Sequence, residues 1–264
     1  MNTRLSTCVL CPRLCRTSCP VATGSAREAA VPTLIATAVR EWRHGRLARA
    51  SAVQAVTLCT DCGACQERCH IDEELPAKLR AIRAELLPTP PVDPLSPIEG
   101  EGEIVAIEAD ERPLAAAVAE RLGQPVRRWV TTDRLGIEAV EHPSWDKVAA
   151  RIRGHAGSLR IVVVDGGVAH ALTAANVGFQ WLHDLLPDLP RGVGSCRTNG
   201  ARPLACCGGA GPLPLHHPED ADRVGRLFYE RADDRFVVDG RCRNHLRGCG
   251  GQVSDPLDAL LEEG

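Results

Sequence analysis

The stretch Cys59-Thr-Asp-Cys62-Gly-Ala-Cys65-Gln-Glu-Arg-Cys69 places four cysteines on one short segment, separated by gaps of two, two and three residues. Cysteines this close in sequence are poor disulfide partners, but their thiolates are good metal ligands. The whole chain has 13 cysteines in 264 residues, an odd number, and the N-terminus has no charged-then-apolar signal region. These features predict metal binding in a reducing compartment rather than a disulfide framework.

A second group of cysteines lies upstream, with the pattern Cys8-x2-Cys11-x3-Cys15-x3-Cys19-Pro20. The downstream group has the bacterial ferredoxin spacing C-x2-C-x2-C-x3-C, in which the fourth cysteine binds the other of two [4Fe–4S] clusters. The first group departs from this spacing by one residue in its second gap, and His70 replaces the proline expected after Cys69. Crossed ligand sets follow: Cys8, Cys11, Cys15 and Cys69 for cluster one, and Cys59, Cys62, Cys65 and Cys19 for cluster two.

Two alternative interpretations of these eight cysteines remain. Two zinc ions, each held by four cysteines, would use the same residue type, but zinc sites prefer two separated cysteine pairs to four cysteines in a row. Disulfides are the other alternative. The paired quartets therefore favour iron–sulfur clusters.

Composition and charge exclude several classes of protein. Hydrophobic residues make up 44% of the chain and charged residues 25%, which is typical of a globular protein. The net charge of −3 disfavours a general binder of nucleic acid or anionic membranes. No apolar run approaches the roughly 20 residues of a membrane helix. We therefore expect a cytoplasmic protein without a transmembrane segment.

A proline-rich segment divides the chain into two parts of different character. Residues 88–103 contain five prolines followed by two glycines, which is the composition of an extended linker. Residues 1–87 predict a helical domain, and residues 104–264 alternate strands and helices as in an α/β layer with a mostly parallel sheet. The predicted fold class is therefore α + α/β. The predicted helices cover 26–49, 50–56, 74–87, 114–122, 144–153, 169–186 and 220–232, and the strands 103–107, 126–130, 159–164 and 235–238.

A second cysteine constellation lies in the α/β part. Cys206 and Cys207 are adjacent in a glycine-rich turn, and glycines allow close approach of the backbone to a cluster. Cys242, His245 and Cys249 follow downstream, and Cys196 lies upstream. These residues indicate a candidate metal centre built on Cys206, Cys207 and Cys242, with Cys249, Cys196 or His245 as possible further ligands.

The motifs quoted above resemble those of a known family. Residues 15–22 (CRTSCPVA) and 59–69 (CTDCGACQERC) resemble the helical dicluster ferredoxin domain of the iron–sulfur subunits of glycolate oxidase, anaerobic glycerol-3-phosphate dehydrogenase and heterodisulfide reductase. The segment around Cys206-Cys207-Gly208 resembles the cysteine-rich CCG domain that follows it in those subunits. Gly167 and His245 stand where that pattern has cysteines.

The resemblance implies an electron-transfer subunit of an oxidoreductase complex. Two [4Fe–4S] clusters would relay single electrons from a flavoprotein dehydrogenase to a quinone or disulfide acceptor. No flavin motif is visible, so the flavin would belong to a partner, through which the chain could lie at the inner face of the membrane. A third iron–sulfur or zinc centre and a decayed third site both remain open. Two other functions are a disulfide or quinone reductase acting at the CCG site and an iron–sulfur redox sensor.

Overall fold

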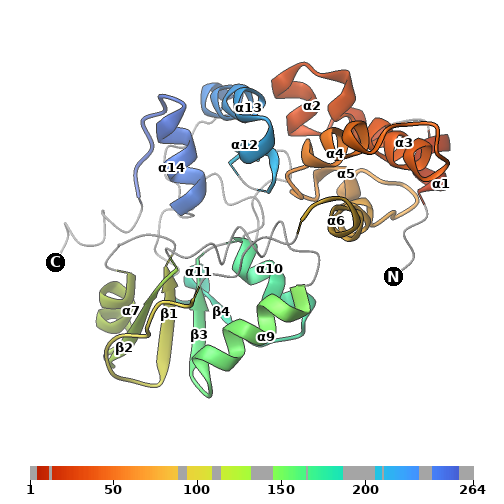
Figure 1. Ribbon diagram of the computed structural model, residues 1–264. Helices are drawn as coiled ribbons and strands as arrows, with labels where there is room; N and C mark the ends of the chain where they lie inside the picture. Colours follow the sequence, from red (N-terminus) through yellow and green to blue (C-terminus); the bar gives the residue numbers. More distant parts are fainter. Residues whose placement is uncertain are drawn as a thin grey trace.

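The computed structural model describes residues 5–11, 14–88, 94–108, 114–131, 145–164, 166–186, 206–209, 211–231 and 240–255. Short helices around one apolar core form its N-terminal part (Figure 1). These elements are α1 (Ser6–Leu10), η1 (Leu14–Arg16), α2 (Pro20–Ser25), η2 (Glu28–Ala30), α3 (Pro32–Arg43), α4 (Arg49–Thr57), α5 (Ala64–Glu67) and α6 (Leu75–Leu86).

Helix α3 is the longer helix expected between the two cysteine groups, but it is shorter than the predicted 26–49. Ala26 adopts a left-handed conformation with φ of 55°, and Pro32 occupies the first turn of α3. Proline favours that position because its missing N–H has no partner there. Ile35 and Val39 are one turn apart and fully buried, which fixes the helix against the core.

The following part is a four-stranded parallel sheet in the order β2-β1-β3-β4. The central strand β1 (Ile104–Glu108) is buried along its whole length, as expected when helices cover both faces of a parallel sheet. Its neighbours are β2 (Val126–Val130) and β3 (Arg160–Val163), and β4 (Gln180–Trp181) extends the edge. The prediction of a parallel α/β layer is therefore confirmed.

Helices pack on both faces of this sheet. Helices α9 (Trp145–Ala156) and α10 (Gly166–Ala174) share one apolar cluster with the strands. Helices α7 (Leu114–Leu122) and α11 (Leu182–Leu185) contribute to a second cluster on the opposite face. The predicted helix 169–186 is interrupted, because Asn176 adopts φ of 55° and ends α10 before the chain returns as β4. The chain is helical again only in the short α11.

Part of the proline-rich segment packs on the sheet. Leu95 and Ile98 lie against the sheet core, and Glu99 forms an antiparallel bridge with Arg128 of the edge strand β2. The backbone oxygen of Ser96 lies 2.8 Å from Nε2 of His155. Residues 94–99 are therefore attached to the α/β layer.

The C-terminal helices α12 (Leu213–His216) and α13 (Pro218–Arg231) pack against the N-terminal helices, as Figure 1 shows for α13 and α2. Leu213, Ala221 and Val224 are buried in the N-terminal core. A Cβ at Gly24 of α2 would lie 2.8 Å from the Val224 Cα, so glycine permits this close approach. Arg27 and the buried Asp220 add an ion pair between the two segments.

Helix α14 (Gly240–Gly248) was not predicted from the sequence. It buries Cys242 and Leu246, one turn apart, beside Cys207. The buried Arg243 holds the following segment through an ion pair of 2.6 Å with Asp255. The predicted strand 235–238 lies outside the described residues.

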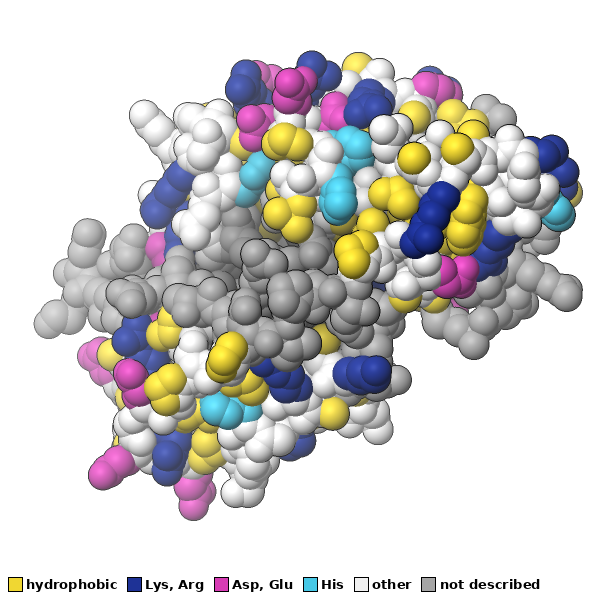
Figure 2. All heavy atoms as spheres, in the orientation of Figure 1, with side chains coloured by type: hydrophobic (Ala, Val, Ile, Leu, Met, Phe, Trp, Pro, Cys, Tyr) yellow, Lys and Arg dark blue, Asp and Glu magenta, His cyan; other side chains and the backbone are white. Residues whose placement is uncertain are grey.

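Acidic and basic side chains are interspersed over both the helical and the sheet part of the face in Figure 2. Among the residues that the structure describes, no helix is long and apolar enough to cross a membrane.

Candidate iron–sulfur sites

Two pockets in the N-terminal part are lined by the eight cysteines of the two sequence groups. Cys8, Cys11, Cys15 and Cys69 line the first pocket, and Cys19, Cys59 and Cys62 line the second. Cys65 and Leu75 border both pockets, so the two spaces are neighbours. Their volumes, counted to the open mouth, are about 390 and 380 Å³.

The fourth cysteine of each group lies with the other group. Cys69 comes from the downstream group but borders the pocket of Cys8, and Cys19 comes from the upstream group but borders the pocket of Cys59. This is the arrangement in which two adjacent cubane clusters share two ferredoxin-type segments.

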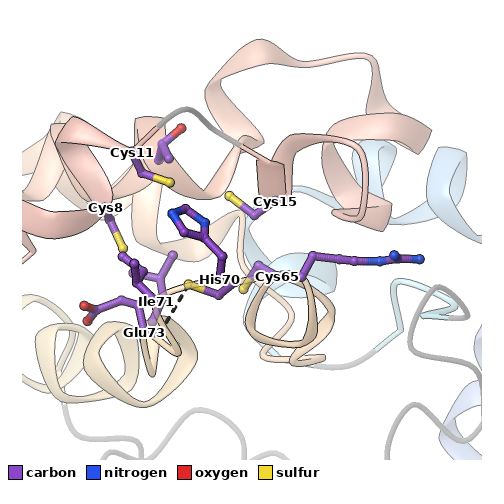
Figure 3. Close-up of a pocket in the computed structure, with 11 residues that line it drawn as sticks. Cys8, Cys11, Cys15, Cys65, His70, Ile71 and Glu73 are labelled. Atoms are coloured by element: carbon purple, nitrogen blue, oxygen red, sulfur yellow. Dashed lines mark hydrogen bonds between the residues drawn. The ribbon is translucent and has the colours of Figure 1, made fainter.

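In the first pocket, short helices and turns direct the thiols toward one space. Figure 3 shows the sulfur atoms of Cys8, Cys11, Cys15 and Cys65 around the pocket, with the His70 ring between them. Cys8 lies on α1 and Cys15 on the 3-10 turn η1. The backbone N–H of Glu73 donates a hydrogen bond of 3.2 Å to Cys69 Sγ, which stabilises a thiolate there.

The second pocket depends on an unusual backbone between Cys59 and Cys65. Asp61 and Gly63 both have positive φ, 59° and 80°, which turns the chain so that successive cysteines face one space. The backbone N–H of Asp61 donates a hydrogen bond of 3.4 Å to Cys59 Sγ. The Asp61 carboxylate is fully buried and forms an ion pair with the fully buried Arg83. This pair anchors the loop to helix α6.

The separation of the ligand atoms can be compared with that in a mononuclear zinc site. Zinc–sulfur bonds of about 2.3 Å in a tetrahedron place the sulfurs about 3.8 Å apart. Among the described residues, the one group with three ligand atoms within 4.8 Å of one another is Asp222, His245 and Cys249. Within the part of the chain that the structure describes, no three cysteines of the two pockets therefore have sulfur atoms within 4.8 Å of one another.

Burial keeps these thiols protonated when no metal is bound. Burial raises the pKa of Cys8, Cys19 and Cys59 to about 12 in each case, and nearby acidic groups and thiols add to the effect. The pKa of Cys65 is raised further, also mainly by burial. Metal binding requires the thiolate, so cluster assembly must release these protons.

The cysteines of the CCG turn point in two directions. The Sγ of Cys206 lies 3.4 Å from the Thr60 Oγ1, beside the second pocket, whereas Cys207 is buried with Cys242 next to α14. Backbone N–H groups of Gly208 and Gly209 donate to the Sγ atoms of Cys206 and Cys207 at 3.4 and 3.3 Å. Cys206, Cys207 and Cys242 do not form one compact ligand group.

Two of the three further ligands predicted for this third site lie in the described part of the chain. His245 of α14 and Cys249, which directly follows this helix, lie together with Asp222 of α13 beside them. Cys196 lies outside the described residues. Burial raises the pKa of Cys249 to about 11, and the nearby Asp222 adds to this shift. Sequence reasoning missed Asp222, because a single aspartate on an amphipathic helix carries no motif.

The same chemistry appears in a comparison with known protein families. Residues 4–72 match the family model of the 4Fe-4S dicluster domain. The match covers both cysteine groups and supports iron–sulfur electron transfer in general. No curated protein and no solved structure matches the chain.

Proposed function

We propose that this protein relays single electrons through two [4Fe–4S] clusters. Cys8, Cys11, Cys15 and Cys69 would hold the first cluster, and Cys19, Cys59, Cys62 and Cys65 the second. The observation that carries the proposal is the pair of adjacent cysteine-lined pockets with a shared wall at Cys65. Such clusters supply reversible one-electron chemistry over a wide range of potentials.

The chain's own residues set the conditions for this chemistry. Apolar side chains of α3 and α6, among them Ile35 and Leu79, border the second pocket and limit its contact with water. Backbone N–H groups of Asp61 and Glu73 donate to cysteine sulfurs, and such hydrogen bonds raise a cluster's reduction potential by stabilising added negative charge.

The donor and acceptor follow from the family resemblance. A flavoprotein dehydrogenase would deliver the electrons, and a quinone or a disulfide would receive them. The chain would thus serve as the electron-transfer subunit of an oxidoreductase complex.

A second candidate function is supported by the CCG turn. Cys206 reaches Thr60, the residue after Cys59, and a Cβ at Gly211 would lie 3.1 Å from the Thr60 Cα. The thiol of Cys206 therefore lies against the loop of the second pocket. In this candidate, the CCG site itself reduces a disulfide or quinone.

One anaerobic experiment distinguishes the electron relay and the reductase from an iron–sulfur redox sensor. The cluster-loaded protein is photoreduced, freed of reductant, and mixed with menadione or an aromatic disulfide while the visible cluster absorbance is followed. A relay returns to the oxidised spectrum over several cycles and retains its iron and sulfide. Loss of the clusters in the first oxidation would contradict the relay and indicate a switch.

The double variant Cys206→Ser/Cys207→Ser tests the second candidate in the same assay. If the CCG thiols carry the chemistry, reoxidation by the acceptor slows by at least tenfold. If the chain is a simple relay, reoxidation by menadione proceeds at the wild-type rate. The control is the cluster-free protein, in which no cluster can pass electrons to the acceptor.

A further inference from the structure

The facing surfaces of α13 and α14 carry three metal-binding side chains in one small group. Asp222 comes from α13, His245 from the last turns of α14, and Cys249 from the residue that directly follows α14. The backbone N–H of Cys249 donates a hydrogen bond of 3.0 Å to the His245 carbonyl oxygen, so the helical turn continues to this residue. Residues four apart on a helix lie on the same face, so His245 and Cys249 present their side chains to one point. One ligand atom from each of the three residues lies within 4.8 Å of the other two.

We propose that Asp222, His245 and Cys249 bind a single zinc ion, separate from the two cluster pockets. The Cys249 Sγ lies 3.7 Å from the Asp222 Oδ1 and 3.7 Å from the His245 Nε2. Tetrahedral zinc with a sulfur bond near 2.3 Å and nitrogen or oxygen bonds near 2.1 Å requires separations of about 3.6 Å. The present spacing therefore needs little rearrangement on binding.

The combination of ligands favours zinc over other common metals. A thiolate disfavours Mg²⁺ and Ca²⁺, which take oxygen ligands, whereas zinc accepts sulfur, nitrogen and oxygen together. On binding, the thiol of Cys249 would lose its proton. The His245 Nε2 would give up its hydrogen bond of 3.1 Å to the Ala221 carbonyl oxygen and bind the metal as the neutral tautomer that carries its proton on Nδ1.

Gly225 leaves the space that the ion needs. A Cβ at this position would lie 2.7 Å from the Cys249 Sγ and 3.0 Å from the His245 Nε2. Gly225 lies on α13 one turn after Asp222, where an interior glycine costs helix stability of roughly 1 kcal/mol relative to alanine. The absence of a side chain here is thus unfavourable for the helix but keeps the three ligands accessible to one another.

The site would join α13 to α14 and leave one coordination position for water. Asp222 lies at the surface, and His245 and Cys249 are half-buried, so solvent reaches the group. Three protein ligands with an open fourth position are typical of zinc that remains accessible to solvent. The proposal does not depend on electron relay, because none of the three residues lines a cluster pocket.

Zinc content and zinc coordination of the cluster-loaded protein test the proposal. The protein is purified anaerobically, equilibrated with zinc, dialysed, and analysed for zinc and iron together. We expect about one zinc per chain, with X-ray absorption showing one sulfur at about 2.3 Å and nitrogen or oxygen ligands at about 2.0–2.2 Å. Zinc bound by four sulfurs would place it in the cysteine-lined pockets and overturn the proposal.

Variants at the site provide the matched comparison. Cys249→Ser and Asp222→Asn should weaken zinc binding by at least tenfold while the iron content stays at the wild-type value. Glu230→Gln, which changes an exposed carboxylate on the same helix, should retain zinc. Gly225→Ala should also weaken zinc binding although no ligand is removed and the helix gains propensity. Wild-type zinc affinity in Cys249→Ser would overturn the proposal.

Discussion

Replacing both Cys8 and Cys69 with alanine is expected to remove one cluster and leave the other intact. The two residues lie in different sequence groups but border the same pocket. The variant should therefore contain about four irons per chain instead of about eight. Removing Cys62 together with Cys69 is expected to abolish both clusters, because these two residues border different pockets.

The comparison of these two double variants decides how the cysteines are shared. If each sequence group held its own cluster, the results would be reversed: Cys62→Ala/Cys69→Ala would keep about four irons and Cys8→Ala/Cys69→Ala would lose all of them. The measurement is iron and acid-labile sulfide per folded chain after anaerobic reconstitution. The single variants serve as controls, and each should retain about four irons.

Replacing Arg83 with methionine is expected to give the largest loss of stability among single changes outside the cysteines. Arg83 is fully buried, forms an ion pair with the buried Asp61, and donates a hydrogen bond of 3.2 Å to the Val56 carbonyl oxygen. Arg80 approaches the same carboxylate at 3.6 Å but does not replace the closer partner. Removing one member of a buried pair leaves an uncompensated charge and costs about 3–5 kcal/mol.

The variant Arg43→Met is the matched control. Arg43, at the end of α3, forms an ion pair of 2.8 Å with Glu85 of α6, and the two side chains are 31% and 46% exposed. Exposed pairs contribute about 0–1 kcal/mol, so this change should scarcely move the midpoint of anaerobic chemical denaturation. Equal effects of the Arg83 and Arg43 changes would contradict the role assigned to the buried pair. In Arg83→Met/Asp61→Asn, the loss should be partly recovered, because the unpaired charge is gone.

The sequence predicted the elements whose signal is local. Residues 104–108 and 160–163 are short apolar runs, and both are strands of the parallel sheet. The cysteine spacing likewise led to the two proposed ligand sets, and each set lines one pocket, although Cys65 borders both. Their use as cluster ligands remains a proposal.

The sequence could not predict the features that depend on contacts between distant segments. Val224 packs against Gly24, and Asp220 pairs with Arg27, although about two hundred residues separate the partners. No periodicity within residues 213–231 reveals that this segment leaves the α/β part and joins the N-terminal core. The sequence does not predict helix α14, because its residues Gly240–Gly248 include few apolar side chains.

The break in the predicted helix 169–186 has a different cause. Its apolar residues suit either a helix or a buried strand, and Asn176 with a positive φ decides between them. Phe179 and Trp181 then pack edge to face at the end of the sheet, with ring centroids 5.4 Å apart.

Metal analysis combined with EPR spectroscopy tests the two-cluster relay most directly. Anaerobically purified protein should contain about eight irons and eight acid-labile sulfides per chain. After full reduction it should show two S = 1/2 signals that broaden each other, because the two pockets share the wall at Cys65. Zinc in both pockets without sulfide would contradict the account, and so would about twelve irons, which would require a third cluster.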